Sequence, residues 1–375
     1  MDLTVLAVGA VVGAVVGLLV QNILYPMVVR KVGVRRARAH SRAVDQAWAT
    51  IHSRSPRLEL VQSGWAPDGT FADASVQITL GPAYCLPESL VPLRERHAPD
   101  WEADGFFNGE QIGVRGMRIR RLSDDPERAA IGSTHLLEID ANPYNYYDFL
   151  STHVLRLTGE PEERSTLRAV ADESRDDPSQ IDWPTPLSVG LSLFCDGGDT
   201  LFAPRRTAKR EGGGYWEAGK VYNAVGEGMN RRDFISLNGP LRATPITTAR
   251  RGLLEEVGLS AHQVNDTHIR MHSFALATDL LDYKFFGLGT TLMSRSEVEE
   301  CWRSAPDRAE AQSAAGAAFF DVSSHSAARR LLSLIGNQQG DWAPEAVFST
   351  VRSLLHLRRV SERDLLAHFG GTSRI

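Results

Sequence analysis

Two adjacent carboxylates and a nearby guanidinium are the residues of this chain whose types and spacing could do chemistry. Glu255 and Glu256 follow Arg251 closely in the stretch Thr244 to Leu259. Hard divalent cations prefer carboxylate oxygens, and a diphosphate needs its charge neutralised before water can attack it. The pair could therefore hold Mg2+ or Mn2+ against a diphosphate. The plainer interpretation of such a pair is a solvated helix face.

A short helix must position these side chains. Thr244 suits the N-cap, Pro245 suits the first helical position, and Gly258 suits the left-handed position after the last turn. These signals predict a helix from about Pro245 to Val257. The arginine and the first glutamate are four residues apart and share one side of it.

The stretch Arg251-x-Leu253-x-Glu255-Glu256-x-Gly258-Leu259 resembles the second half of the Nudix box, G-x5-E-x7-R-E-U-x-E-E-x-G-U, where U is aliphatic. The resemblance implies a hydrolase that cleaves the diphosphate of a nucleoside diphosphate linked to another moiety. It also implies roles for three residues. Glu255 and Glu256 would be catalytic and bind Mg2+ or Mn2+, and Arg251 would orient the glutamates through a charge-assisted contact.

Two features depart from that pattern. The family has glutamate after the arginine, whereas this chain has Gly252, so one of three carboxylates expected on a single helix face is missing. Glycine inside a helix costs about 1 kcal/mol relative to alanine, so local stability does not explain it. The turn containing Glu227 lies further from Arg251 than the pattern allows, and Ala243 stands where spacing would put the first glutamate. Glu227 cannot fill that role by spacing, but it could by proximity.

A second stretch supports the same resemblance. Leu187 to Phe194 predicts a strand, Cys195 to Asp199 a hairpin turn, and Thr200 to Arg206 the returning strand. A strand, a D-G-G turn and a strand ending in Arg-Arg are similar to the start of a Nudix domain. The resemblance implies four substrate-binding residues, which are Arg205, Arg206, Gly226 and Gly228.

Three functional hypotheses follow. The first is a membrane-anchored Nudix-type hydrolase, favoured by the arginine and the glutamate pair. The second is a Nudix-like domain without turnover that binds a nucleotide or nucleotide sugar as a sensor at the membrane, and Gly252 favours it. The third is a structural role.

An acidic helix expected at Ser294 to Trp302 offers candidates for the missing carboxylate, namely Glu297, Glu299 and Glu300.

The N-terminal segment predicts a membrane anchor. Residues 4–20 carry no charge and the apolar character continues to Val29, which is long enough to span a bilayer. Asp2 and the lack of an A-x-A site argue against a cleaved signal peptide. The basic residues that follow place the N-terminus outside and the remaining chain in the cytoplasm. A stripe of Gly9, Gly13 and Gly17 permits homodimerisation, although small residues are also common in membrane helices.

Composition bounds the remaining possibilities. The chain has 375 residues and a net charge of -5, which gives no electrostatic case for nucleic acid as a partner. Three isolated cysteines fit a reducing compartment.

For residues 187–360 the resemblance implies an α/β/α sandwich with a mixed sheet. We expect a transmembrane helix at 1–29, a basic juxtamembrane segment at 30–52, a strand-rich cytoplasmic α+β domain at 53–158, a linker at 159–186, the Nudix-like domain at 187–360 and a C-terminal tail at 361–375.

Overall fold

The computed structural model describes most of the chain after residue 46. The described ranges are 47–51, 58–66, 68–72, 75–104, 106, 108–121, 135–173, 183–205, 219–235, 241–278, 281–306, 316–338 and 340–369. The predicted membrane span, with its glycine stripe and most of the basic segment after it, lies outside these ranges. No helix within the described part of the chain is long and apolar enough to cross a membrane.

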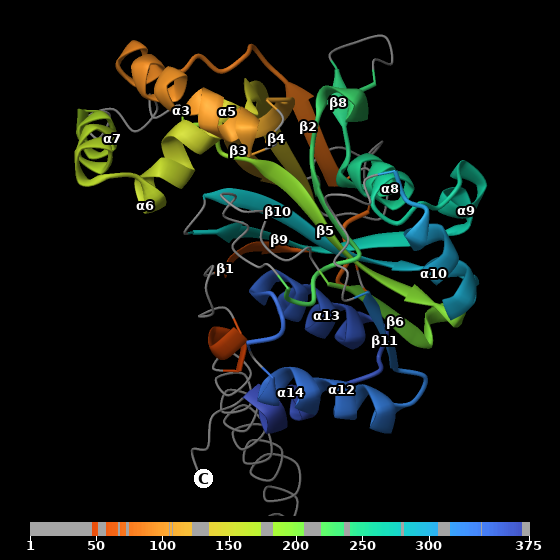
Figure 1. Cartoon of the computed structure of the whole chain (residues 1–375). Helices are drawn as coiled ribbons and strands as arrows, with labels where there is room; N and C mark the ends of the chain where they lie inside the picture. The colour runs from red at the N-terminus through yellow and green to blue at the C-terminus, as the bar shows by residue number, and fades with distance from the viewer. Residues whose placement is uncertain are drawn as a thin grey trace, which may run out of the picture. The chain divides into compact units, whose positions relative to one another are not determined.

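The chain divides into two compact units, residues 1–50 with 365–375 and residues 51–364. Of the first unit the structure describes 47–50, which are helical, and 365–369, which belong to helix α14 (Glu362–Phe369). The second unit holds both sheets (Figure 1).

A seven-stranded mixed sheet forms the centre of the second unit. β5 (Leu187–Cys195), buried along its whole length, pairs in parallel with β10 (Asp282–Thr290). The other pairings in this sheet are antiparallel. Along the sheet the order is β1 (Leu58–Ser63), β9 (His268–Ala277), β10, β5, β6 (Thr200–Pro204) and β11 (Ala317–Asp321), and β7 (Val225–Gly228) also pairs with β5.

A smaller mixed sheet of four strands packs into the same core. Its order is β3 (Glu110–Arg121), β4 (His135–Asn145), β2 (Val76–Leu80) and β8 (Arg242–Ala243), with β2 parallel to β4. Ile112 N donates to Met229 O at 2.9 Å and Val114 N to Thr185 O at 2.7 Å, so backbone hydrogen bonds tie β3 to the segments flanking β5 and β7. The protein is therefore a mixed α/β protein with two mixed sheets.

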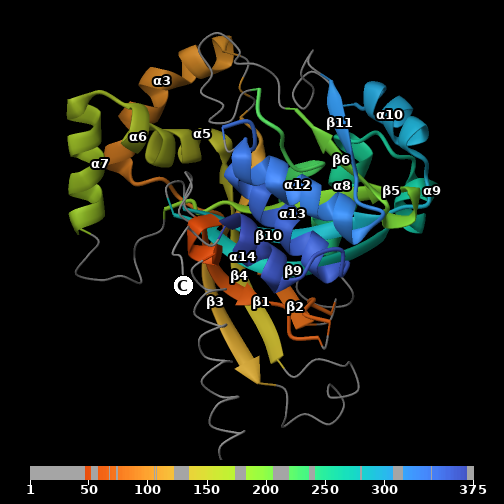
Figure 2. The same cartoon turned by 90° about the horizontal axis from the view of Figure 1, so that it is seen from below.

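Side-chain alternation along β5 separates two layers of helices. Val189 and Leu191 belong to the main core, which they share with Leu253 of α8 (Pro245–Glu255). Ser192 points to the opposite face, where its Oγ lies 2.9 Å from that of Ser349 in α13 (Pro344–His356). Figures 1 and 2 show α13 and α12 (His325–Asn337) on one side of the sheet and α8 on the other.

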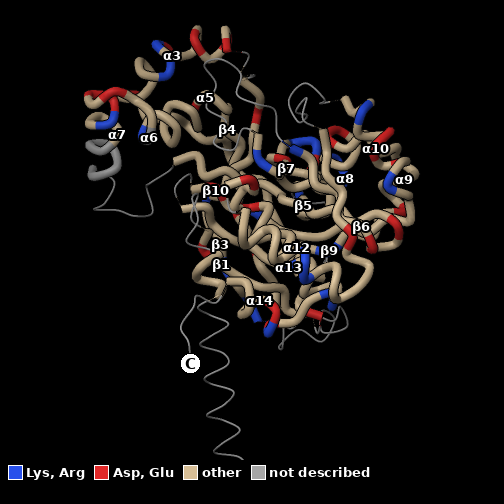
Figure 3. The backbone as a smooth tube through the Cα atoms, turned by 60° about the horizontal axis from the view of Figure 1, so that its bottom comes forward, with Lys and Arg blue, Asp and Glu red and all other residues tan. Residues whose placement is uncertain are grey.

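The remaining helices lie at the edges of these layers. An aromatic cluster that includes Trp101, Tyr147 and Trp183 joins α3 (Val91–Ala103) to the short helices after β4, which are α5 (Tyr146–Phe149), one turn of π-helix (Leu150–Val154) and α6 (Leu155–Thr158). Further helices are α7 (Pro161–Glu173), α9 (Ala261–Asp266) and α10 (Arg295–Arg303). Figure 3 shows acidic and basic residues interspersed on α3, α7 and α10, so these helices carry both signs of charge.

Several predicted elements are confirmed. The hairpin of β5 and β6 turns through Asp196, Gly197 and Gly198, all with positive φ. The helix predicted from Pro245 ends at Glu255, two residues early.

Other elements were not predicted. Strand β1 and helix α12 are additional, α7 lies in the segment predicted as a linker, and α14 lies in the predicted tail. Strands from both sides of that linker pair in each sheet, β1 with β9 and β2 with β8. The division at 159–186 and the finer Nudix-like architecture stay predictions.

Candidate functional site

Helix α8 begins at the predicted Pro245, although the Thr244 side chain makes no capping hydrogen bond, and it ends two residues before the predicted Val257. Thr244 is extended, with φ -124° and ψ 156°, and Pro245 fills the first helical turn. Gly258 adopts φ 75° after the last turn, where a Cβ would overlap the Cys301 carbonyl oxygen. Ala249 and Leu253 are fully buried against the sheet. These contacts fix the rotation of the helix, so its polar side faces β7 and the turn that follows β7.

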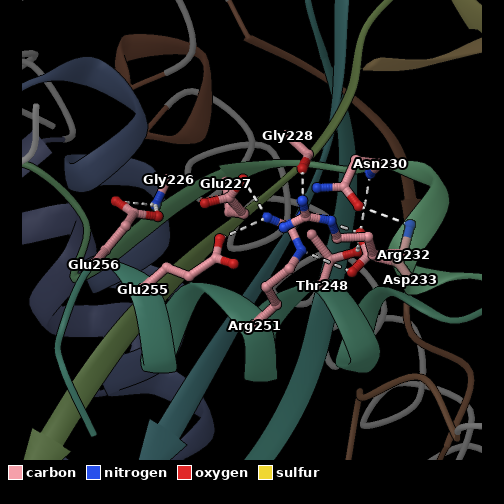
Figure 4. A network of polar contacts seen from close by, with 10 residues as sticks. All are labelled: Gly226, Glu227, Gly228, Asn230, Arg232, Asp233, Thr248, Arg251, Glu255 and Glu256. Carbon is pink, nitrogen blue, oxygen red and sulfur yellow. Dashed lines mark hydrogen bonds and ion pairs between the residues drawn. The ribbon is translucent and has the colours of Figure 1, made fainter. Parts of the chain in front are cut away.

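Arg251 is the centre of a network of carboxylates (Figure 4). Its Nε and Nη2 donate to the two oxygens of Asp233 at 2.9 and 3.0 Å. Its Nη1 donates to Glu227 Oε1 at 2.7 Å and to Glu255 Oε2 at 2.9 Å. Its Nη2 also donates to Gly228 O at 2.6 Å. One guanidinium thus joins α8 to β7 and to the turn after β7.

Asp233 is the most deeply buried carboxylate of this network, with 1% of the residue exposed. It ends a short 3-10 turn, Arg231–Asp233, whose cap is Asn230. Besides the arginine, its Oδ2 accepts from Asn230 N at 3.0 Å and from Thr248 Oγ1 of α8 at 3.0 Å. Both oxygens of a buried carboxylate are therefore satisfied.

The electrostatics of Arg251 follow from these contacts. Burial alone would lower the pKa of the guanidinium, but the hydrogen bonds to Asp233 and the charge of Glu227 outweigh burial and raise the pKa. Its side chain is 12% exposed. Because three carboxylates surround one cation away from bulk water, the arginine is held as a fixed positive charge that the site itself neutralises.

Glu256 is engaged differently. Its Oε1 and Oε2 accept from Gly226 N, at 2.9 and 3.2 Å. This contact ties the last turn of α8 to the first half of β7. Gly228, at the other end of β7, lies so close to Gln111 that a Cβ there would overlap the Gln111 amide. Both glycines predicted to bind substrate therefore lie beside α8, Gly226 through Glu256 and Gly228 through the contact of its carbonyl with Arg251.

Gly252 has a packing reason. A Cβ built on it would overlap Val225 Cγ1 and would lie 3.2 Å from Glu227 Cβ. Strand β7 therefore occupies the space that a side chain at this position would need. Glu227 belongs to β7 and not to α8, and its carboxylate accepts from Arg251 beside that of Glu255. Glu227 of β7 thus places a carboxylate near the helix face where Gly252 provides none. The spacing in the sequence argued against this role for Glu227, but its proximity in the fold is compatible with it.

The metal expected from the resemblance needs carboxylate oxygens directed at one point. Glu255 accepts from Arg251, Glu256 accepts from a backbone N–H, and position 252 has no room for a side chain. Across the part of the chain that the structure describes, no group of three or more His, Cys, Asp or Glu side chains is arranged to hold a metal ion. The residues in this arrangement do not fit a Mg2+ or Mn2+ site.

The other predicted site residues lie apart from this network. Arg205 follows β6, and its Nη1 donates to Gly219 O at 3.0 Å. Arg206 lies outside the described residues. On α10, Glu297 accepts from the N–H of its own cap Ser294 at 2.7 Å. Glu299 pairs with Arg303 of the same helix at 2.6 Å. Both observed contacts of these acidic residues are local to their own helix.

Asp233 and Thr248 were not among the predicted site residues, and Asp233 lies in residues 229–243, which separate the Glu227 turn from Arg251 by more than the family pattern allows. A signal was present in Asn230-x-x-Asp233, an Asn followed three residues later by a carboxylate, which is the pattern of a capped turn. No protein-family model matches the chain, and no curated protein matches it. Its function must be inferred from the site itself.

Proposed function

We propose that this chain is a membrane-anchored module whose Nudix-like α/β/α domain binds a nucleotide-derived small molecule without hydrolysing it. The observation that carries the proposal is the packing of Gly252 under Val225. Strand β7 occupies the space that a third carboxylate on α8 would need, so the packing of the fold itself requires a glycine at position 252. The ligand class comes from the resemblance of the helix and of the β5–β6 hairpin to the Nudix family.

The contacts of Arg251 support a structural role for α8, the helix that resembles the second half of the Nudix box. The five hydrogen bonds of this guanidinium join α8 to β7 and to the turn after it, and four of them go to carboxylate oxygens. Charge-assisted hydrogen bonds of this kind are about twice as strong as neutral ones and fix geometry. In this proposal the helix fastens β7 and the turn after it, and a ligand is bound by groups that this fastening positions.

A specific observation favours a second candidate, the hydrolase. Glu227 and Glu255 both accept from the same Arg251 nitrogen, so Glu227 brings a carboxylate close to the helix face that lacks one. A hydrolase would use Glu227 in place of the residue at 252, and its carboxylates would have to leave the arginine to meet Mg2+ or Mn2+.

One experiment separates the two candidates. The full-length chain in detergent is assayed for turnover and for equilibrium binding against nucleoside diphosphate sugars, dinucleotides and nucleoside triphosphates, each with Mg2+ or Mn2+. The variants are Glu256→Gln at the site and Glu95→Gln, an exposed carboxylate of α3, as the matched control. Saturable binding without turnover supports the binding module. Turnover that is retained in the control and lost in Glu256→Gln establishes the hydrolase and contradicts the first candidate. The absence of both binding and turnover would contradict both candidates.

A further inference from the structure

Two imidazole rings stack face to face on the sheet face opposite α8. His272 of β9 is fully buried, and His356 lies on the last turn of α13. Their ring centroids are 4.9 Å apart and the ring planes differ by 11°. This stack joins the central sheet to the helix that covers it.

The hydrogen bonds of the two rings satisfy their neutral forms, and the same partners would also accept from a protonated ring. His272 Nδ1 lies 3.0 Å from Ser273 Oγ and its Nε2 lies 3.3 Å from Ser353 Oγ. A hydroxyl can donate or accept, so either neutral tautomer of His272 is satisfied. His356 Nδ1 lies 3.0 Å from Asp68 O and must donate to it, because a carbonyl oxygen only accepts.

The charges around the stack oppose protonation. Burial lowers the pKa of His272 well below its ordinary value, and His356, Arg352 and Arg270 lower it further. Burial also lowers the pKa of His356, where the Asp68 carbonyl and carboxylate act against Arg352 and Arg270. The Thr70 hydroxyl and N–H hold the pKa of Asp68 below its ordinary value, so this carboxylate keeps its charge in weak acid. Two arginines and one carboxylate therefore face the pair, and a proton on either ring adds a third cation.

The loop at 64–72, described except for residue 67, rests on this stack. Gly64 N donates to His272 O at 3.0 Å, and Phe71 N donates to Met271 O at 2.7 Å. Gly69, with φ 76°, lies against the His356 ring so closely that a Cβ there would be 2.9 Å from Cε1. The loop leaves β1 in the large sheet and leads to β2 in the small sheet.

A second ring contact carries the loop to the small sheet. Trp65 stacks on His135 of β4, with centroids 5.3 Å apart, and meets Phe71 edge-on at 5.4 Å. Loss of the His356 contact would therefore loosen a segment that touches both sheets. His135 is a further titratable group that faces this loop.

We infer that the stacked His272–His356 pair is a pH-sensitive clasp, which fastens the 64–72 loop to α13 when both rings are neutral and releases it when a ring takes up a proton. A histidine whose pKa is lowered by folding favours the folded state at neutral pH, and that contribution is lost as pH falls below the ordinary value near 6.5. Release on acidification is the direction that these groups require.

Hydrogen exchange on the full-length chain tests the clasp, at pH values of about 7.5 and about 5.5, on either side of the ordinary histidine pKa. Rates are corrected for intrinsic exchange at each pH. We expect protection of amides in 64–72 and in the last turn of α13 to fall in acid by up to about tenfold, because the acid pH lies about one unit below the ordinary histidine pKa of the released state. His356→Gln keeps a donor for Asp68 O without a titrating ring, so it should show a smaller fall. His262→Gln, at an exposed histidine of α9 paired with Asp266, is the matched control and should behave as wild type.

Two results would overturn the clasp. One is equal protection of the loop at both pH values in the wild type. The other is a fall in His356→Gln as steep as in the wild type. Should His356→Gln not fold, the ring-proton titration of the wild type decides. Both rings should titrate below about 6.5 together with the loss of protection. If His356 titrates with a pKa of about 6.5 while the protection of the 64–72 amides stays constant, the inference is contradicted.

Discussion

Gly252 of α8 lies directly against Val225 of β7, so close that a Cβ on the glycine would overlap the valine Cγ1. Neither element can easily retreat. β7 pairs with β5 along Ser188 to Leu191, and Gly226 N is held by Glu256 of the helix itself. The glycine is thus a requirement of packing, and its cost in helix propensity is offset by the close approach of strand and helix.

Alanine at position 252 should destabilise the protein. Inserting a methyl group into a packed contact costs about 1–3 kcal/mol, which exceeds the gain of about 1 kcal/mol that alanine brings to a helix. Denaturant unfolding measures the difference. Gly116→Ala is the matched control, because nothing lies within 4 Å of a Cβ at that glycine.

Truncation of the valine should rescue the alanine variant in part. Val225→Ala removes the atom that the new methyl group would overlap, so Gly252→Ala with Val225→Ala should be less destabilised than the sum of the single variants. Additive effects would show that the overlap is relieved elsewhere. A Gly252→Ala protein as stable as the wild type would contradict the packing account outright.

Substitution of Arg251 should cost more. Arg251→Gln leaves Asp233, with 1% exposed, without its cation, and breaking a buried ion pair costs about 3–5 kcal/mol. Arg251→Lys should fall between, since an ammonium cannot reproduce the two-pronged contact with Asp233. Arg303→Lys on α10 is the matched control, because its pair with Glu299 is 68% exposed at the arginine and surface pairs contribute below about 1 kcal/mol. Equal losses at both arginines would contradict the role of Arg251 as the centre of the carboxylate network.

The sequence predicted the parts of this site that obey local rules. The proline and the glycine that bound α8, and the D-G-G hairpin between β5 and β6, are set by backbone preferences that neighbouring residues reveal. The contact of Gly252 with Val225 joins residues far apart in the chain, so no local pattern contains it. The partners of Arg251 follow the same division. Glu255 is four residues away and was expected, whereas Asp233 reaches it only through the turn after β7.

The larger fold shows the same limit. β9 and β10 follow each other in the chain with only a short segment between them, so their pairing could be predicted. The pairing of β2 with β4 and of β1 with β9 brings distant segments together, and the register is chosen by the shared core. The linker was predicted from charged and proline-rich sequence, and α7 lies in it with two glutamates in its first turn.

Asp282 should make stability depend on pH in a definite direction. Burial raises its pKa to about 6, against the opposing charge of Lys284 and with the help of Glu345. A carboxyl whose pKa is raised by folding takes up protons in the folded state first, so its unfavourable contribution fades as pH falls from 7 towards 4. The stability of the wild type relative to Asp282→Asn should therefore rise by an amount on the order of 1 kcal/mol between pH about 7.5 and about 5.

Denaturant unfolding at the two pH values measures that difference, and Asp266→Asn, on the exposed side of α9, is its matched control. The control should show no comparable rise. If the difference between wild type and Asp282→Asn is constant, or falls in acid, burial does not outweigh the contacts with Ser188 and Lys284 at this carboxyl.

The central claim is that the carboxylates of α8 are held by Arg251 and by the Gly226 N–H and are not presented to a metal. Mn2+ titration of the full-length chain, followed by electron paramagnetic resonance of the free ion, tests it most directly. We predict that the wild type takes up no more Mn2+ than Glu255→Gln or Glu256→Gln. Saturable binding of one Mn2+ by the wild type, lost in both variants and kept in Glu95→Gln, would contradict the claim and restore the hydrolase to first place.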